Sequence, residues 1–512
     1  CTRDNKHFVR LWSEVSIENI GFNCISREES NLSKRRWFPY QKGGEYRQWC
    51  GNNSYIVDWE NDGYKLLNMD TLGWTGNSTN HNLNYIFKPA IVWSKIVSTI
   101  PNFRFVKSGF LFDDASGLCA LKDTFDTNVV LGFLCSKVGR YYMDVINPTL
   151  NIQPRNMGSM PFIKPMRYID IDLILDISKN DWNSRETSWD FEQSPLLNNS
   201  SSLPSSYSNW NNKVTEDFFQ LQKNEEELNR IFIDIYGLQD ELTPDVALKD
   251  ITILQEEMDR KELESRNGEL LAAKSGLPIK KDVVIKQLIS YAVGCFMGRY
   301  RLDKPGLNIA HLDPIEEELT AYSYHDHIFE IDDDGIIPTM GSESPFSDDI
   351  VFRVKEFIQM IWGVNTLTEN LNFINECLGE DLEKYLTKKF WNDHKKTYKK
   401  KPIYWQFASP KGAFKVIAYM HRMNRFTVQK IRQNYLFKQN QWLEHEIQQL
   451  ANNEALLSSK ESKRLDNLRK NQVECREFDL ILKDISDKQI EFDLDDGVTE
   501  NYKLFEGVVS KI

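Results

Sequence analysis

Basic and aromatic residues alternate between residues 34 and 55, and this combination suits contact with nucleic acid. Guanidinium and ammonium groups neutralise phosphates, while flat aromatic rings stack on bases. Gly43 and Gly44 can adopt positive φ and offer a surface free of side chains, which a polyanion backbone can approach closely. A cationic loop over a small aromatic core has the same composition, so residue types alone leave both interpretations open. The predicted DNA contacts here are Arg35, Arg36, Lys42, Gly43, Gly44 and Arg47.

A second basic block runs from residue 384 to residue 401 and continues to a turn at 411–412. Lysine-rich helix faces are ordinarily solvated surface, and that is the plain alternative here. Tyr398, Tyr404 and Trp405 interleave with the block, as in segments that hold a nucleic-acid backbone. The predicted DNA contacts in this block are Lys395, Lys396, Lys399, Lys400 and Lys411.

The distribution of charge favours a polyanionic partner more than the total charge does. The 512 residues carry a formal net charge of −12. Residues 1–165 carry +4 and residues 381–440 carry +12, so the remaining residues carry −28. Two basic regions therefore stand in an acidic body, and local potential steers an approaching polyanion.

Several segments resemble the adenine-specific DNA methyltransferases of the bacterial BREX phage-defence system, the PglX family. They are KHFVRLWSEV near the start, KRRWFPYQKGGEYRQWCGNNSYIVDWENDG from residue 34, ISYAVGCFMGRYRLDKPGL near residue 300, KPIYWQFASPKGAFKVIAYMHRMNR near residue 410 and DLDDGVTENY near the end. The resemblance covers nearly the whole chain. It implies a protein of the bacterial cytoplasm that binds double-stranded DNA and works with other BREX subunits. It also implies that the intact enzyme methylates N6 of adenine in a short site, with S-adenosylmethionine as cofactor, and so marks host DNA.

The chain lacks the motifs that adenine methylation needs. In this chemistry a Pro-Pro loop grips the extruded adenine, and a glycine-rich turn admits the cofactor. None of the 17 prolines are adjacent, and no two glycines stand in a GxG arrangement. Together with a start at Cys1 rather than at methionine, these absences predict the C-terminal half of such an enzyme. We therefore expect target recognition and clamping of DNA, with no catalytic residue and no cofactor site in this chain.

Metal-dependent chemistry finds little support in the sequence. The string from Pro244 to Lys261 imitates a nuclease motif, but its surroundings are typical of a helix rather than of strands. His445 has no second histidine at the spacing of a zinc protease. For His325 and His327, an exposed acidic loop is favoured over a metal pair, so no metal site is predicted.

Changes in composition predict an α+β fold with three domains. A mixed α/β target-recognition domain is expected over residues 1–165. A helical spacer is expected over 166–335, with a flexible Ser/Asn-rich connector near 196–212. A mainly helical C-terminal domain, which contains the basic block 384–411, is expected over 336–512.

Local patterns predict the elements inside these domains. Strands are expected within 84–96 and 103–112, because these segments are rich in β-branched and aromatic residues. A helix capped by Asp126 or Thr127 is expected to run to about residue 145. Apolar residues at helical spacing predict a second helix from about residue 214 to a stop at Gly237. The charged segment after Trp442 predicts one or two long amphipathic helices.

The competing hypothesis is a protein-interaction scaffold, in which the acidic helical regions dock other defence-system subunits or a phage-encoded DNA mimic. No run of 18 apolar residues exists, so a membrane partner is not expected. The eight cysteines contain no CxxC pair, which suits reduced thiols in a cytoplasm.

Overall fold

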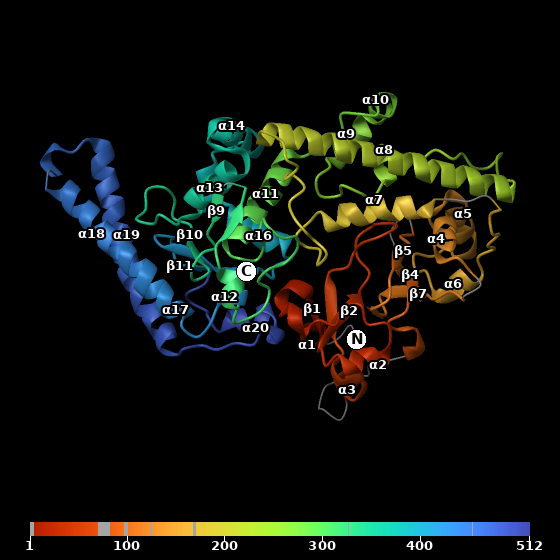
Figure 1. Cartoon of the computed structure of the whole chain (residues 1–512), viewed down its shortest axis with the longest axis horizontal. Coiled ribbons are helices and arrows are strands. Elements are labelled where there is room, and N and C mark those ends of the chain that lie inside the picture. Colours follow the sequence, from red (N-terminus) through yellow and green to blue (C-terminus); the bar gives the residue numbers. More distant parts are fainter. Residues whose placement is uncertain are drawn as a thin grey trace. The chain divides into compact units, whose positions relative to one another are not determined.

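The computed structural model confirms an α+β fold, and the chain divides into two compact units (Figure 1). The structure describes residues 5–69, 82–96, 101–122, 125–166, 170–325, 327–452 and 454–512. The first unit comprises Cys1–Trp12, Ile17–Phe191 and Tyr207–Val283. The second unit comprises Ser13–Ser16, Glu192–Ser206 and Val284–Ile512. These boundaries differ from the expected divisions near residues 165 and 335.

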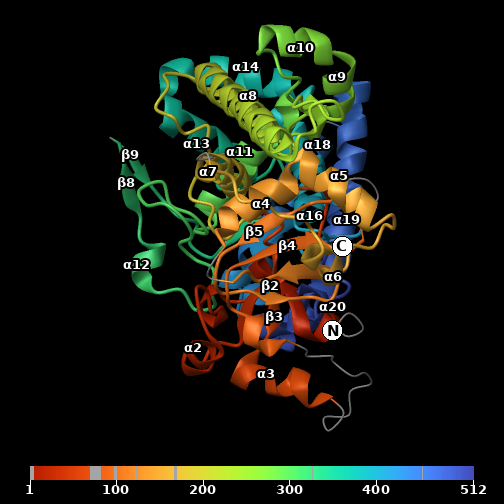
Figure 2. The same ribbon diagram turned by 90° about the vertical axis from the view of Figure 1, so that its right-hand side faces the viewer.

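A four-stranded sheet in the first unit carries the segment that contains the first predicted contacts. Its strand order is β1-β3-β2-β6, with β1 at Val9–Leu11, β3 at Tyr55–Asp58, β2 at Trp37–Gln41 and β6 at Leu111–Phe112. Strand β2 pairs antiparallel with β3 and parallel with β6. Every residue of β2 is buried, because its side chains fill the core on both faces. Figure 2 shows this sheet with the short helices α2 (Arg27–Leu32) and α3 (Glu60–Leu67) beside it.

A second sheet in the same unit has the antiparallel order β5-β4-β7. Its strands are β5 at Arg104–Val106, β4 at Ala90–Ser94 and β7 at Ser116–Cys119. Strands β4 and β5 fall inside the two segments predicted to be extended. The predicted helix is interrupted: Asp126 caps α4 (Thr127–Cys135), and Ser136 ends it and caps α5 (Lys137–Ile146).

Long helices complete the first unit. Helix α7 spans Ile171–Asn183, and α8 runs from Leu203 to Tyr236 before Gly237, which has φ of 63° as the predicted stop requires. The helix therefore begins inside the tract expected to be a flexible connector. Ser206, in that tract, accepts a hydrogen bond from the Trp362 indole at 2.9 Å, within the second unit.

The second unit contains a sheet that was not predicted, because the last third of the chain was expected to be helical. Strands β10 (Ile336–Pro338), β12 (Lys415–Tyr419) and β11 (Tyr404–Ala408) form an antiparallel sheet. Helices surround this sheet. They are α11 (Lys281–Phe296), α13 (Ile350–Trp362), α14 (Leu367–Leu378), α15 (Leu382–Lys388), α16 (Phe390–Thr397) and α20 (Val498–Lys503).

A helical hairpin precedes α20 in the second unit, as the charged C-terminal pattern predicted. Its first arm joins α17 (Thr427–Lys430), a π-helix at Ile431–Leu436 and α18 (Phe437–Ala451) without a break. Its second arm is α19 (Ser459–Asp487), which Ser458 and Glu461 begin with a reciprocal capping box. Among the described residues, no helix is both long and apolar enough to cross a membrane.

Candidate nucleic-acid interface

The arginines predicted to contact phosphate at one end of β2 differ in their surroundings. Arg35 is exposed and forms no ion pair with any described residue. Arg36 is half-buried; its Nε donates to Asp58 Oδ2 at 2.9 Å, and its guanidinium lies 5.1 Å from the centroid of the Trp37 ring. Asp58 itself is 2% exposed. Arg36 therefore neutralises a buried carboxylate, while Arg35 is available to solvent or to a ligand.

The glycine pair lies at the other end of β2 and has the positive φ that the sequence predicted. Gly43 has φ of 71° and Gly44 has φ of 154°. The Gly44 N–H donates to Ser94 Oγ at 3.3 Å, which fastens the loop to the end of β4. The Lys42 ammonium lies 4.9 Å from the centroid of the Tyr55 ring. Gly44 is exposed, Lys42 is half-buried and Gly43 is buried, so this loop presents the Gly44 backbone at the surface, and the predicted contact at Gly43 is not accessible.

The two groups of predicted contacts are separated by the length of β2. A strand rises about 3.3 Å per residue, so the seven steps from Arg35 to Lys42 span at most about 23 Å. One strand of duplex DNA advances about 3.4 Å along its axis per phosphate. The two groups could therefore reach phosphates up to about seven base pairs apart.

Arg47 is buried inside the first unit rather than exposed at its surface, with 2% of its area accessible. Its Nη2 donates to Asp181 Oδ2 and to Ser178 O, both at 2.9 Å. Its Nε donates to Cys50 O at 2.6 Å, and its Nη1 donates to Thr252 O at 3.2 Å. This guanidinium has no free surface to offer a phosphate, so we leave Arg47 out of the interface proposed below.

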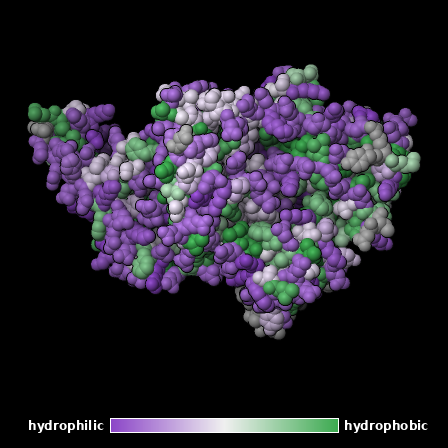
Figure 3. Space-filling model, in the orientation of Figure 1, coloured by the Kyte–Doolittle hydropathy of each residue, from purple (hydrophilic) through white to green (hydrophobic). Residues whose placement is uncertain are grey.

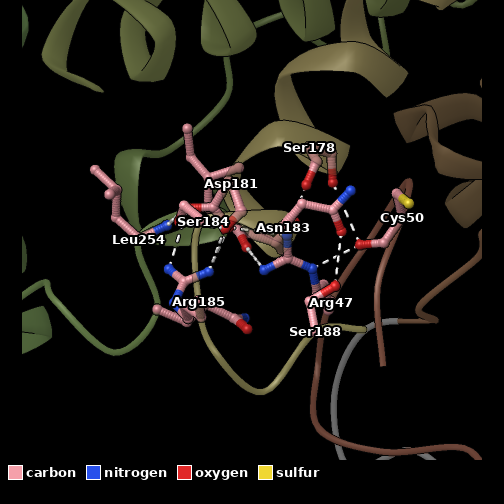
Figure 4. A network of polar contacts seen from close by, with 12 residues as sticks. Arg47, Cys50, Ser178, Asp181, Asn183, Ser184, Arg185, Ser188 and Leu254 are labelled. Carbon is pink, nitrogen blue, oxygen red and sulfur yellow. Dashed lines mark hydrogen bonds and ion pairs between the residues drawn. The ribbon is translucent and has the colours of Figure 1, made fainter. Parts of the chain in front are cut away.

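Arg47 belongs to a buried network in which two arginines balance two carboxylates (Figure 4). Arg185 donates to both oxygens of Glu257, at 2.9 and 2.5 Å, and to Asp181 Oδ2 at 3.1 Å. Burial alone would raise the pKa of Asp181, but Arg185 and Arg47 outweigh it and hold that pKa at about 2. Asp181 therefore keeps its charge at neutral pH, and the network joins the segment after the glycine pair to α7.

The segment after Arg47 adopts a backbone that its side chains alone would disfavour. Trp49 has φ of 71° although it is bulky and fully buried. Its indole N–H donates to Glu225 Oε1 at 2.7 Å, on α8. Gly51 has φ of 121°, and a Cβ there would stand 2.4 Å from Arg47 Nε, so only glycine fits. No sequence signal identified Asp181 or Glu225 as partners, because they lie more than 130 residues away from Arg47 and Trp49.

An open groove of about 800 Å³ adjoins the glycine loop in the first unit. Its walls include Lys95, next to the Ser94 that holds Gly44, and the edge strand β7. Its lining is largely apolar and aromatic, with Phe112, Phe133 and Phe162 among the lining residues. Aromatic faces in a groove beside a cationic loop offer stacking surfaces for bases.

The second basic block lies in the second unit. Lys396, Lys399 and Lys400 are exposed. Lys395 is half-buried; its Nζ donates to Lys511 O at 3.0 Å and lies 4.6 Å from the Trp391 ring centroid. Lys411 is exposed, and its backbone N–H donates to Glu474 Oε1 at 2.7 Å. The structure thus presents four of the five predicted lysines to solvent.

A buried histidine anchors the turn that carries these lysines. His394 Nε2 accepts hydrogen bonds from the N–H groups of Ile403 and Tyr404, at 3.2 and 3.1 Å. Because an accepting nitrogen must be unprotonated, the imidazole is neutral. Burial, assisted by the charge of Arg299, lowers the pKa of His394 to about 3. No sequence pattern indicates this role, since His394 stands in a run of lysines.

Metal and nuclease chemistry receive no support from the described residues. Within them, no group of three or more His, Cys, Asp or Glu side chains could hold a metal ion. Asp259, in the string that imitates a nuclease, caps α9 (Arg260–Ser265) by accepting from the N–H groups of Lys261 and Glu262. The residue between His325 and His327 lies outside the described residues.

Comparison with known proteins supports the resemblance noted in the sequence. The chain is 34% identical over 531 residues to the adenine-specific methyltransferase BrxX of Escherichia coli O9:H4 (strain HS), covering 99% of this chain and 42% of that protein. It is 33% identical over 527 residues to the adenine-specific methyltransferase PglX of Lacticaseibacillus casei (strain Zhang), covering 98% of this chain and 41% of that protein. No family model matches the sequence. The chain thus spans about two fifths of the length of these homologues, and the narrower expectation of a C-terminal half finds no support in them.

Proposed function

We propose that this chain recognises and clamps double-stranded DNA as part of an adenine-specific DNA methyltransferase that marks host DNA in BREX phage defence, in the bacterial cytoplasm. The similarity of nearly the whole chain to two proteins named adenine-specific methyltransferases carries this proposal. Exposed Arg35 at one end of β2 and half-buried Lys42 at the other support it, because cationic groups neutralise phosphates.

In this proposal different residues hold the backbone and read the sequence. Arg35, Lys42 and the backbone at Gly44 contact phosphates and set the register of the duplex. Arg36 positions this surface by neutralising Asp58. The aromatic groove beside the glycine loop is where we place contacts to bases, and Lys396, Lys399, Lys400 and Lys411 hold the backbone elsewhere on the duplex.

We assign methyl transfer to residues outside these 512. The glycine pair after β2 is the nearest approach to a cofactor turn, but it lacks the GxG spacing of such a turn, and we propose no S-adenosylmethionine site there. The sequence also lacks the Pro-Pro loop that would grip an extruded adenine.

Charge reversal at one end of β2 tests the proposed DNA contact. Replacing Lys34 and Arg35 by Glu should weaken binding to duplexes of any sequence, because phosphate contacts carry no sequence information. Each lost contact should reduce the slope of log K against log salt by about 0.9. Arg36 is spared because its loss would leave buried Asp58 with only the longer ion pair to Lys65 Nζ, at 3.4 Å. Fluorescence anisotropy with a labelled duplex at several salt concentrations gives both quantities.

The matched control replaces two exposed lysines, Lys249 and Lys274, by Glu, which changes the net charge equally away from β2. An equal loss of affinity in this control would show that total charge, rather than this surface, governs binding. An unchanged slope in the Lys34→Glu, Arg35→Glu variant would rule out the proposed contact.

The lysine block is expected to make a contact that ignores sequence. Replacing Lys396, Lys399 and Lys400 by Gln should lower affinity by the same factor for host genomic fragments and for random duplexes. Lys395 is spared because it bonds to the Lys511 carbonyl. Competition binding with the two DNA pools measures the ratio of the affinities for host fragments and for random duplexes. A loss confined to host fragments would mean that the block reads bases, and no loss at all would mean a solvated face.

Other BREX subunits are the protein partners that we propose for an acidic part of the second unit. The hairpin of β8 (Tyr322–Tyr324) and β9 (His327–Phe329) follows α12 (Glu316–Leu319), which begins with three glutamates. Ile328 in this hairpin is 68% exposed. A two-stranded hairpin leaves edge backbone groups that another chain can pair with. Titration with purified subunits, in the presence and absence of DNA, separates this role from DNA binding.

A further inference from the structure

The basal and distal halves of the C-terminal helical hairpin differ in how much protein they pack against. The basal half of α19 packs on the β11–β12 end of its own unit: the Phe478 and Phe414 rings lie 6.1 Å apart, and Cys475 Sγ donates to Ala413 O. In the distal half, the buried side chains of α19 are Leu465 and Leu468. Figure 1 shows the distal ends of α18 and α19 standing away from the β10–β12 sheet. The distal hairpin therefore has solvent around most of its circumference.

Charged residues of the distal hairpin follow two patterns. The arginines of α19 pair across to the first arm and the tip: Arg464 with Glu446 at 2.9 Å, and Arg469 with Glu454 at 3.0 Å. The lysines form no such pairs among the described residues. Lys460, Lys463 and Lys470 are exposed, as is Asn467 between them. The arginine ion pairs thus link α19 to the first arm and the tip, while the lysine ammonium groups are exposed at the surface.

The three lysines share one face of α19. Residues 460, 463, 467 and 470 follow the three- and four-residue spacing that stacks side chains along a helix. We call this set the lysine face; it spans about 15 Å at 1.5 Å per residue. Asp466 borders it and pairs with none of the three lysines within ion-pair distance. In Figure 3 the hairpin, at the left, is mostly hydrophilic, with an apolar end.

The lysine face continues toward a residue already assigned to DNA. Glu474, one turn beyond Lys470, accepts from the backbone N–H groups of Lys411 and Ala413, at 2.7 and 3.4 Å. These two hydrogen bonds hold the turn that carries Lys411 against α19, one helical turn beyond the lysine face.

We propose that the lysine face of α19 lies along the phosphate backbone of duplex DNA, so that the distal hairpin acts as an arm of the clamp. The charge of the face is complementary to a polyanion, and its length matches about four phosphates of one strand. Flexible lysine stems suit a contact that follows any sequence. This inference rests on the proposed function of the chain, and it adds a surface that the basic blocks of the sequence did not identify.

The test reverses Lys460, Lys463 and Lys470 to Glu in the full chain. Affinity for a 40-base-pair duplex should fall at least tenfold at low salt, and the slope of log K against log salt should fall by about 2.7 for three contacts. The same three positions changed to Arg should retain wild-type affinity and slope. A control with Lys249, Lys274 and Lys304 reversed to Glu carries the same net charge on other exposed helices and loops.

Each outcome decides between distinct conclusions. If the lysine-face variant loses no more affinity than the control, the inference is overturned while the proposed function stands. If the wild-type chain does not bind duplex DNA, the proposed function itself fails. If the variant alters sedimentation of the chain instead of DNA affinity, the face joins two copies and the inference is wrong. Urea unfolding of all three variants excludes misfolding as the cause, because the altered side chains are exposed.

Discussion

Replacing Arg47 by alanine is expected to lower the free energy of unfolding of the first unit by about 3–5 kcal/mol, the usual cost of breaking a buried ion pair. The substitution would leave Asp181 with Arg185 alone. It would also strip the carbonyls of Cys50, Ser178 and Thr252 of a donor, and buried acceptors without donors are costly. Urea unfolding followed by circular dichroism measures the loss.

The comparison with Arg35 makes this prediction specific. Arg35→Ala should change the free energy of unfolding by no more than about 0.5 kcal/mol, because that side chain is exposed. Conversely, folded Arg47→Ala protein should keep the wild-type salt slope for DNA, since it loses no phosphate contact. A stable Arg47→Ala variant with a reduced slope would return Arg47 to the DNA interface and contradict the network described here.

Acidification should destabilise the second unit through its buried histidines. The pKa of His394 and that of His421 are each lowered to about 3 by burial, with Arg299 adding to the effect. The unfolded chain takes up these protons near pH 6.5, whereas the folded chain does not, so stability is lost as pH falls below 6.5. At pH 5 each histidine should cost about 2 kcal/mol, at 1.36 kcal/mol per pH unit.

A single substitution isolates the His394 contribution. Gln at this position keeps an oxygen that can accept from Ile403 and Tyr404 but cannot titrate. The stability advantage of wild type over His394→Gln should therefore shrink by about 2 kcal/mol between pH 7 and pH 5. The comparison with the variant is needed because burial raises the pKa of Asp332 to about 6. Protonation of Asp332 increases the stability of the folded state over the same pH range, and this effect cancels between wild type and variant. A difference that stays constant with pH would show that His394 titrates normally in the folded state.

Local signals in the sequence predicted the elements whose causes are local. Asp126 caps a helix where its side chain accepts from nearby N–H groups, and Gly237 ends α8 with positive φ. Ser136 was not recognised as a break, because its capping role depends on an abrupt change of direction between α4 and α5. The sheet containing β11 was missed because lysines precede β11 and because β10, which pairs with the central strand β12, lies more than 60 residues before β11.

In the candidate interface, too, contacts between distant segments could not be predicted from local sequence patterns. Arg35 and Arg47 look alike in the sequence, as arginines among aromatic residues. What separates them is Asp181 and Thr252, which approach only when α7 and the loop before α9 pack on the strand segment. His394 looks like surface for the same reason. Sequence composition located the cationic segments, but long-range packing decides which cations remain free.

The π-helix in the first arm of the hairpin determines the rotation of α18 about its own axis, and therefore which of its side chains face α19. A π-turn holds one residue more than an α-turn, so deleting one residue from Ile431–Leu436 would regularise the helix and rotate α18 by about 100°. Leu443 would then leave the seam with α19, and Glu446 would move out of reach of Arg464. A one-residue change of length in this turn would therefore shift α18 out of register with α19 although no side chain of α18 itself is changed.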